Sequence, residues 1–177
     1  MAIERSVFHE ILKDSYSAYY NIIEPELPEG TEQEQLPLLF KADYFSRAER
    51  YWLTKNIPIW GNEKNEFAYI FSAPEFSVEL AGRCVDFALE DGLARVKPHK
   101  EHQYTNIQVV LLADRLSDDV IKTVQKRSFS KSYKHSLHGY STLLLAAVDL
   151  SAGKAHANKA GRDLVDYFGK LFALRAE

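Results

Sequence analysis

The sequence predicts a single α+β domain in which a mixed, largely antiparallel sheet of about six to seven strands packs against four helices. Its length of 177 residues is typical of one domain. Its hydrophobic fraction of 46% and charged fraction of 27% are those of an ordinary globular protein. Stretches with apolar residues at helical spacing alternate with shorter stretches of alternating or wholly apolar residues. The expected element order over residues 1–177 is therefore α-β-β-β-α-β-α-β-β-β-α.

The first half of the chain is expected to contain two helices with three strands between them. Apolar residues recur every three or four positions over residues 3–23, which predicts an amphipathic helix. After an acidic loop, alternating residues predict three strands joined as a meander, with a turn at residues 61–65. These strands are expected at residues 36–46, 51–60 and 66–71. The sequence Ser72-Ala-Pro-Glu75 has the spacing of a capping box, so a second helix is expected there, ending at Gly92.

The second half is expected to contribute four strands and two helices. Residues 107–113 and 141–148 are apolar on both faces, apart from single polar residues, which is typical of strands in the middle of a sheet. The other two strands are expected at residues 130–137 and 154–157. Ser117 is expected to cap a short helix, and Asn158 is expected to cap the last helix of the chain.

The net charge of −3 conceals two halves of opposite sign. Residues 1–94 carry 8 Lys/Arg and 17 Asp/Glu, a net charge of −9, whereas residues 95–177 carry 14 and 8, a net charge of +6. The basic half indicates an anionic ligand or partner. The alternative is that the halves compensate each other within the domain or across a homo-oligomer. Nucleic acid is not favoured, because the isoelectric point of about 6.1 is far below the values typical of nucleic-acid-binding domains.

Cysteine content and hydropathy indicate the cellular location. Cys84 is the one cysteine, so no disulfide can form within the chain and a reducing compartment is expected. It falls in the apolar stripe of the second predicted helix, as a buried structural thiol does. No apolar run approaches the roughly 20 residues that a membrane helix needs, and the first residues carry too many charges for a signal peptide. We therefore expect a soluble cytoplasmic protein without membrane contact.

One alternative is a small metal-dependent hydrolase or nuclease. The first six expected elements resemble, in their order, the core of restriction-endonuclease-like folds. The resemblance implies an acid on the second strand and an acid-x-Lys pattern on the third, which together hold a divalent metal. The third predicted strand has Glu66, but Ala68 stands where the lysine is needed. The resemblance therefore assigns no catalytic residue to this chain.

Two histidine pairs have the spacing H-x-x-H: His99 with His102, and His135 with His138. Residues three apart on a regular strand point to opposite faces, so these pairs do not predict a metal site. The sequence also lacks the Walker, G-x-G-x-x-G and G-x-S-x-G patterns. We therefore predict no cofactor.

The strongest candidate site is for an anion, in the basic half. The segment HANKAGRD places Asn158, Lys159 and Arg162 at the expected start of the last helix, where free amide groups and the helix dipole favour an anion. Further basic side chains that could extend this site are Lys131, Lys134, His135 and His138.

The sequence as a whole favours a non-catalytic binding or assembly module with an anion-binding site in its basic C-terminal region. The hydrolase or nuclease remains one alternative. A purely structural homo-oligomeric protein, whose charge asymmetry is satisfied internally, is the other.

Overall fold

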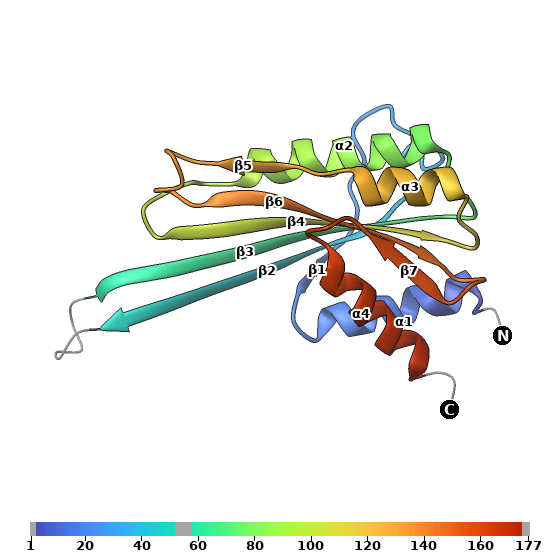
Figure 1. Ribbon diagram of the computed structural model, residues 1–177, viewed down its shortest axis with the longest axis horizontal. Helices are drawn as coiled ribbons and strands as arrows, with labels where there is room; N and C mark the ends of the chain where they lie inside the picture. The colour runs from blue at the N-terminus through green and yellow to red at the C-terminus, as the bar shows by residue number, and fades with distance from the viewer. Residues whose placement is uncertain (1–2, 52–57, 175–177) are drawn as a thin grey trace.

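The computed structural model describes residues 3–51 and 58–174, in which seven strands form one mixed sheet between two layers of helices (Figure 1). The described elements are α1 (Arg5–Ser17), β1 (Asn21–Ile23), β2 (Leu38–Tyr51), β3 (Pro58–Ala73), α2 (Val78–Arg95), β4 (His102–Ala113), α3 (Asp118–Lys126), β5 (Ser130–Ser132), β6 (Tyr140–Asp149), β7 (Lys154–Ala157) and α4 (Arg162–Ala173). Their order is the predicted one, and the α+β class with four helices is confirmed for the described part of the chain.

The sheet is more parallel at its centre than the sequence predicts. The strand order is β1-β2-β3-β4-β6-β5, and β7 also pairs with β6. The pairs β3–β4 and β4–β6 are parallel, while the remaining pairs are antiparallel. The expectation of a largely antiparallel sheet is therefore wrong for these three central strands. Parallel neighbours need a crossover connection, and α2 and α3 supply it by carrying the chain back to the start of β4 and toward β6.

Two long strands replace the predicted three-stranded meander. β2 and β3 pair as one antiparallel hairpin, in which Phe45 lies opposite Asn65 and Leu38 opposite Phe71. The turn expected at residues 61–65 is therefore wrong, because these residues continue β3. Of the strand expected at 51–60, residues 52–57 lie outside the described residues. The first helix ends at Ser17 rather than at residue 23, and the last residues of that apolar stretch form β1 on the edge of β2.

α2 and α3 cover one face of the sheet and share a hydrophobic core with it (Figure 1). α2 begins after Ser77, whose hydroxyl accepts a hydrogen bond from the Leu80 amide at 3.0 Å. The start predicted at Ser72 is wrong, because β3 stays paired with β4 through Ala73. Gly92 does not end the helix; it lies within it, and a Cβ there would meet the Ile107 side chain at 3.0 Å. The predicted cap of α3 is confirmed, since the Ser117 hydroxyl accepts from the Val120 amide.

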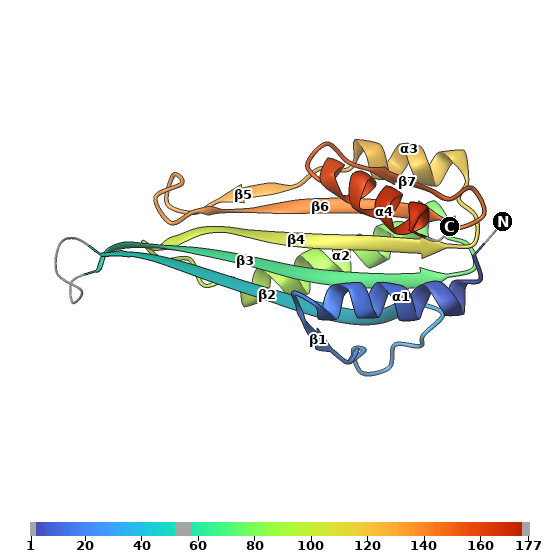
Figure 2. The ribbon, with the colours of Figure 1, turned by 90° about the horizontal axis from the view of Figure 1, so that it is seen from below.

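α1 and α4 cover only part of the opposite face (Figure 2). The second hydrophobic core lies beneath them and includes Phe8 of α1 and Phe168 of α4. Along β3, the residues that face this side change from buried Ile70 and Ala68 to half-buried Glu66 and Lys64. The helices therefore end where the sheet face becomes polar, and this boundary holds the candidate site.

Candidate functional site

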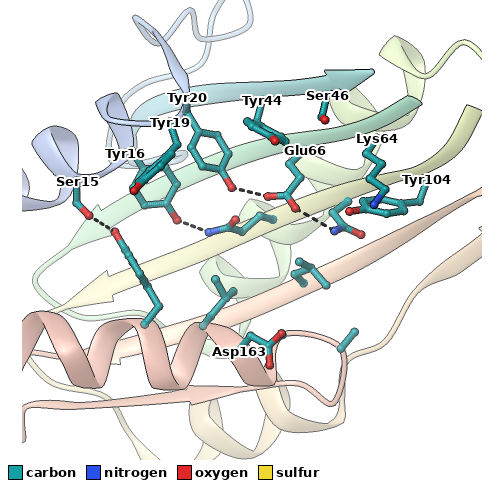
Figure 3. Close-up of a pocket in the computed structure, with 17 residues that line it drawn as sticks. Ser15, Tyr16, Tyr19, Tyr20, Tyr44, Ser46, Lys64, Glu66, Tyr104 and Asp163 are labelled. Carbon is teal, nitrogen blue, oxygen red and sulfur yellow. Dashed lines mark hydrogen bonds between the residues drawn. The ribbon is translucent and has the colours of Figure 1, made fainter. Parts of the chain in front are cut away.

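A groove of about 790 Å³ lies at the boundary between the helices and the open sheet face (Figure 3). Its floor comes from β2, β3, β4 and β6, and its walls come from the end of α1 and the start of α4. The volume falls within the range of small-molecule sites in proteins. We call this feature the tyrosine groove, because its lining includes Tyr16, Tyr19, Tyr20, Tyr44, Tyr104 and Tyr167.

Aromatic contacts link four tyrosines of the groove to one another. The ring centroids of Tyr16 and Tyr20 are 5.1 Å apart, and those of Tyr20 and Tyr44 are 5.7 Å apart. Tyr16 also meets Tyr167 of α4 edge-to-face at 6.1 Å. Such distances and tilted orientations are those that aromatic pairs prefer. The rings therefore form a continuous wall from α4 across α1 to β2.

Glu66 is the central acidic group of the groove. The Tyr20 hydroxyl donates a short hydrogen bond to Glu66 Oε2, and Asn106 Nδ2 donates to Glu66 Oε1 at 3.3 Å (Figure 3). Burial, followed by the hydrogen bond to Glu66, raises the pKa of Tyr20 well above its ordinary value of 10, so the phenol stays protonated and donates. In the described part of the chain Glu66 forms no ion pair, and the ammonium of Lys64 instead lies 5.7 Å from the ring centroid of Tyr104.

Other hydrogen bonds fix the inner end of the groove. Gln108 Nε2 donates a short hydrogen bond to the hydroxyl of buried Tyr16, and the Tyr167 hydroxyl donates to Ser15 Oγ at 2.8 Å. Burial raises the pKa of Tyr16 and of Tyr167 above 10. These bonds join α1 to β4 and α4 to α1. The groove is therefore formed by side chains that the fold already holds in place.

Asn158, the centre of the predicted anion site, has a different role in the structure. Its side chain is buried, with 2% of the residue exposed. Its Oδ1 accepts from the amides of Leu145 (3.1 Å) and Gly161 (2.8 Å), while its Nδ2 donates to the carbonyls of Leu143 and Arg127, both at 3.0 Å. α4 begins only at Arg162 and has no side-chain cap, so the prediction that Asn158 caps it is wrong.

The basic residues of the predicted anion site lie in two groups along the outer edge of β6. Lys131, Lys134 and His135 are exposed at β5 and in the turn that follows it, and β5 pairs with the first residues of β6. Lys159 and Arg162 are exposed at the start of α4, beside the middle of β6. Within the described residues these four Lys and Arg side chains form no ion pair, and Lys131 lies over the ring of Tyr133.

The turn after β5 has an unusual backbone. Lys134, His135 and Ser136 have positive φ values of 48°, 53° and 69°. Residues other than glycine rarely occupy this left-handed region, and here three do so in succession. The predicted strand at 130–137 therefore ends at Ser132. His138, the last candidate residue, is half-buried, and its carbonyl accepts from Nδ1 of His102 at 2.7 Å.

His99, His102 and Cys84 are held by internal contacts. His99 Nε2 lies 3.1 Å from Glu63 Oε2, and His102 Nε2 lies 2.9 Å from the hydroxyl of Thr105. Among the residues that the structure describes, no three His, Cys, Asp or Glu side chains are placed to hold a metal ion. Cys84 is buried in the core beneath α2, and burial raises the pKa of its thiol to about 12, as in an unreactive structural cysteine.

The sequence does not predict the tyrosine groove as a site. Its residues come from six helices and strands and from two loops, and none of them belongs to a catalytic motif. One signal was present: β4 carries Tyr104, Asn106 and Gln108 at alternating positions, which places a polar stripe on one face of an otherwise apolar strand. Such a stripe on a central strand indicates that this part of the face is not covered by the hydrophobic core.

Comparison with known proteins gives a family but no described activity. The family described as Domain of unknown function (DUF8052) matches residues 4–170, so the chain belongs to this family. Neither the comparison with curated proteins nor that with solved structures gives a match. Among the described residues, no helix has the length and apolar character that crossing a membrane requires.

Proposed function

We propose that this domain is a non-catalytic binding module and that its ligand occupies the tyrosine groove. The observation that carries the proposal is the tyrosine wall, which hydrogen bonds already hold in place around an open space of about 790 Å³. Tyrosine offers a large contact area with few rotatable bonds, so little conformational entropy is lost when a ligand binds. A groove that is already formed also avoids the cost of rearrangement.

The raised pKa values of the tyrosines in the groove support a binding role for their phenols rather than proton transfer. A general acid or base works best with a pKa near the working pH. Burial raises the pKa values of Tyr16, Tyr20 and Tyr104, so these phenols move further from neutrality. The phenols of the groove therefore act as hydrogen-bonding and stacking surfaces.

Two neighbouring aromatic residues of β2 provide the test. Tyr44 lines the groove, whereas Phe45 is exposed on the opposite face of the sheet, against Phe67. A small-molecule library screened by thermal shift should yield ligands that raise Tm by about 5 °C or more when near saturation. Tyr44→Ala should abolish this increase, and Phe45→Ala should preserve it.

Each result is judged as a ligand-induced change, so a lower starting Tm of either variant does not affect the comparison. Hits that raise the Tm of Tyr44→Ala and of Phe45→Ala equally would place the ligand outside the groove. Consumption of a hit by the wild-type protein, followed by mass spectrometry, would contradict the non-catalytic part of the proposal.

An anion-binding site in the basic C-terminal region is the second candidate. It is favoured by the exposed side chains of Lys131, Lys134, Lys159 and Arg162, none of which forms an ion pair within the described residues. We expect the affinity for inorganic polyphosphate to fall steeply as salt rises, because exposed charges are screened over about 10 Å at 0.1 M salt. The variant Lys131→Gln/Lys134→Gln should weaken this binding, whereas an affinity that does not depend on salt would rule the site out.

A further inference from the structure

We infer that the tyrosine groove takes a small organic cation whose ammonium group lies beside Glu66, against the rings of Tyr20 and Tyr44. The inference deepens the proposed function and rests on it, because it assigns a chemical class to the ligand of the same groove. Two independent features of the groove support the inference. The first is the Glu66 carboxylate, which has no cation beside it among the described residues, and the second is the arrangement of the rings around it.

Within the described residues, the half-buried carboxylate of Glu66 is held by neutral groups alone. Its two described partners, the Tyr20 hydroxyl and the Asn106 amide, donate hydrogen bonds but bring no positive charge. Removing a carboxylate from water is costly unless a cation accompanies it. Neutral donors recover part of this cost, and a ligand cation beside Glu66 would recover more.

The other charged groups of the groove do not supply that cation. Lys64 is the basic residue of the lining, and its ammonium lies over the ring of Tyr104 rather than in an ion pair with Glu66. Asp163, at the start of α4, adds a second carboxylate to the lining (Figure 3). Among the described lining residues the formal charge is therefore −1, a sign that attracts cations and disfavours nucleotides and other phosphates.

The aromatic rings around Glu66 can contact a cation through their faces. The rings of Tyr20 and Tyr44 are tilted by 47° with centroids 5.7 Å apart, so they enclose an angle rather than stack flat. The Tyr20 hydroxyl contacts Glu66 directly, and Tyr44 and Tyr104 line the same groove (Figure 3). The π face of a tyrosine attracts ammonium groups within about 6 Å, and Lys64 already makes such a contact with Tyr104.

The combination of a carboxylate with several aromatic faces is the chemistry by which proteins recognise alkylammonium groups. A neutral polar ligand could use the same hydroxyls and rings, but it would leave Glu66 without a counter-charge. The two ligand classes therefore differ in one measurable property. Only the affinity for the cation should depend on the charge of Glu66.

Matched pairs of charged and neutral compounds test the inference by titration calorimetry. Choline is compared with 3,3-dimethylbutan-1-ol, its carbon isostere, and phenethylamine with 2-phenylethanol. We expect the wild-type protein to bind the cation of each pair at least about tenfold more tightly than its neutral partner, since each ammonium group gains cation–π contacts and an ion pair with Glu66, and phenethylamine also donates a charge-assisted hydrogen bond. Glu66→Gln should remove this preference without changing the affinity of the neutral compounds.

Glu90→Gln is the matched control, because it removes the same charge from an exposed position on α2, on the other side of the sheet. The cation preference should survive in this variant. The wild-type comparison within each pair needs no substitution, so the inference can be judged even if Glu66→Gln folds poorly. Equal affinities within both pairs, or a preference that persists in Glu66→Gln, would overturn it.

The result also separates this inference from the proposed function. If neutral or anionic compounds bind in a way that Tyr44→Ala abolishes, while the ammonium compounds show no preference, the binding module stands and the cation assignment fails. If no compound of any charge binds in a Tyr44-dependent way, both fail.

Discussion

Asn158→Ala should lower the free energy of unfolding by roughly 3–4 kcal/mol, because it removes the hydrogen-bond partner of the Leu145 amide and of the carbonyls of Leu143 and Arg127. The Asn158 side chain makes four hydrogen bonds, to Leu143 and Leu145 of β6, to Arg127 and to Gly161. On the edge of β6 that faces away from β4, β5 pairs as far as Thr142 and β7 pairs only from Ala146 onward, so no strand covers this side of the residues between them. The Asn158 amide fills this gap in the sheet edge.

Urea denaturation of three variants checks this role. Asn158→Asp keeps both acceptor bonds of Oδ1 but turns a buried carboxylate oxygen toward the carbonyls of Leu143 and Arg127, so we expect a loss at least as large as that of Asn158→Ala. Lys159→Ala changes the exposed neighbour and should stay within about 0.5 kcal/mol of wild type. A loss below about 1 kcal/mol for Asn158→Ala would mean that its side chain is free for another role, such as the predicted contact with an anion.

Asn158 also shows where local sequence patterns stop being informative. An asparagine before an apolar helical stretch is a common N-cap, and the sequence analysis interpreted it as one. The same short amide can bond to any nearby backbone, and here its partners are up to 31 residues away in the chain. Only the packing of α4 and β6 decides whether the asparagine caps a helix or bonds to distant backbone groups. Ser117 was predicted correctly because the hydroxyl and the amide that it caps are three residues apart.

The difference between local and long-range contacts also explains which strands could be predicted. The strands at 107–113 and 141–148 could be predicted because their apolar character directly reflects burial on both faces. The β2–β3 hairpin could not be predicted, because residues 61–65 have the composition of a turn. They are extended only because they pair with β2 on one side and partly with β4 on the other. Pairing between distant segments overrides local preference in such cases.

Only part of the tyrosine groove could be predicted from the sequence. The polar stripe of β4 was readable in the sequence, but Glu66 meets Tyr20 across 46 residues, and Tyr167 meets Ser15 across 152. No spacing rule connects such pairs. The predicted basic residues, by contrast, follow from their charge and from the expected start of the last helix, and the structure distributes them along an edge of the sheet without a shared pocket among the described residues.

Arg95→Leu should destabilise the protein by about 3–5 kcal/mol, because it leaves the carboxylate of Asp43 buried without its cation. Arg95 Nη2 forms a short ion pair with Asp43 Oδ2, and its guanidinium carbon lies 3.9 Å from the ring centroid of Phe67. Burial alone would lower the pKa of Arg95, but hydrogen bonds to Tyr69 and Asp43 outweigh it and raise the pKa. Asp43 is 7% exposed, and its Oδ1 has no hydrogen-bond partner within the described residues.

The exposed pair of Arg127 and Asp86 is the matched control, with an N–O distance of 2.7 Å and side chains that are 44% and 68% exposed. Arg127→Leu should cost less than about 1 kcal/mol, because water solvates the carboxylate that remains. A double variant, Arg95→Leu/Asp43→Leu, should recover much of the stability that Arg95→Leu loses, since an apolar pair of similar size can replace a buried ion pair. If the double variant were no more stable than Arg95→Leu, the loss would come from the contact with Phe67 and not from the unpaired charge.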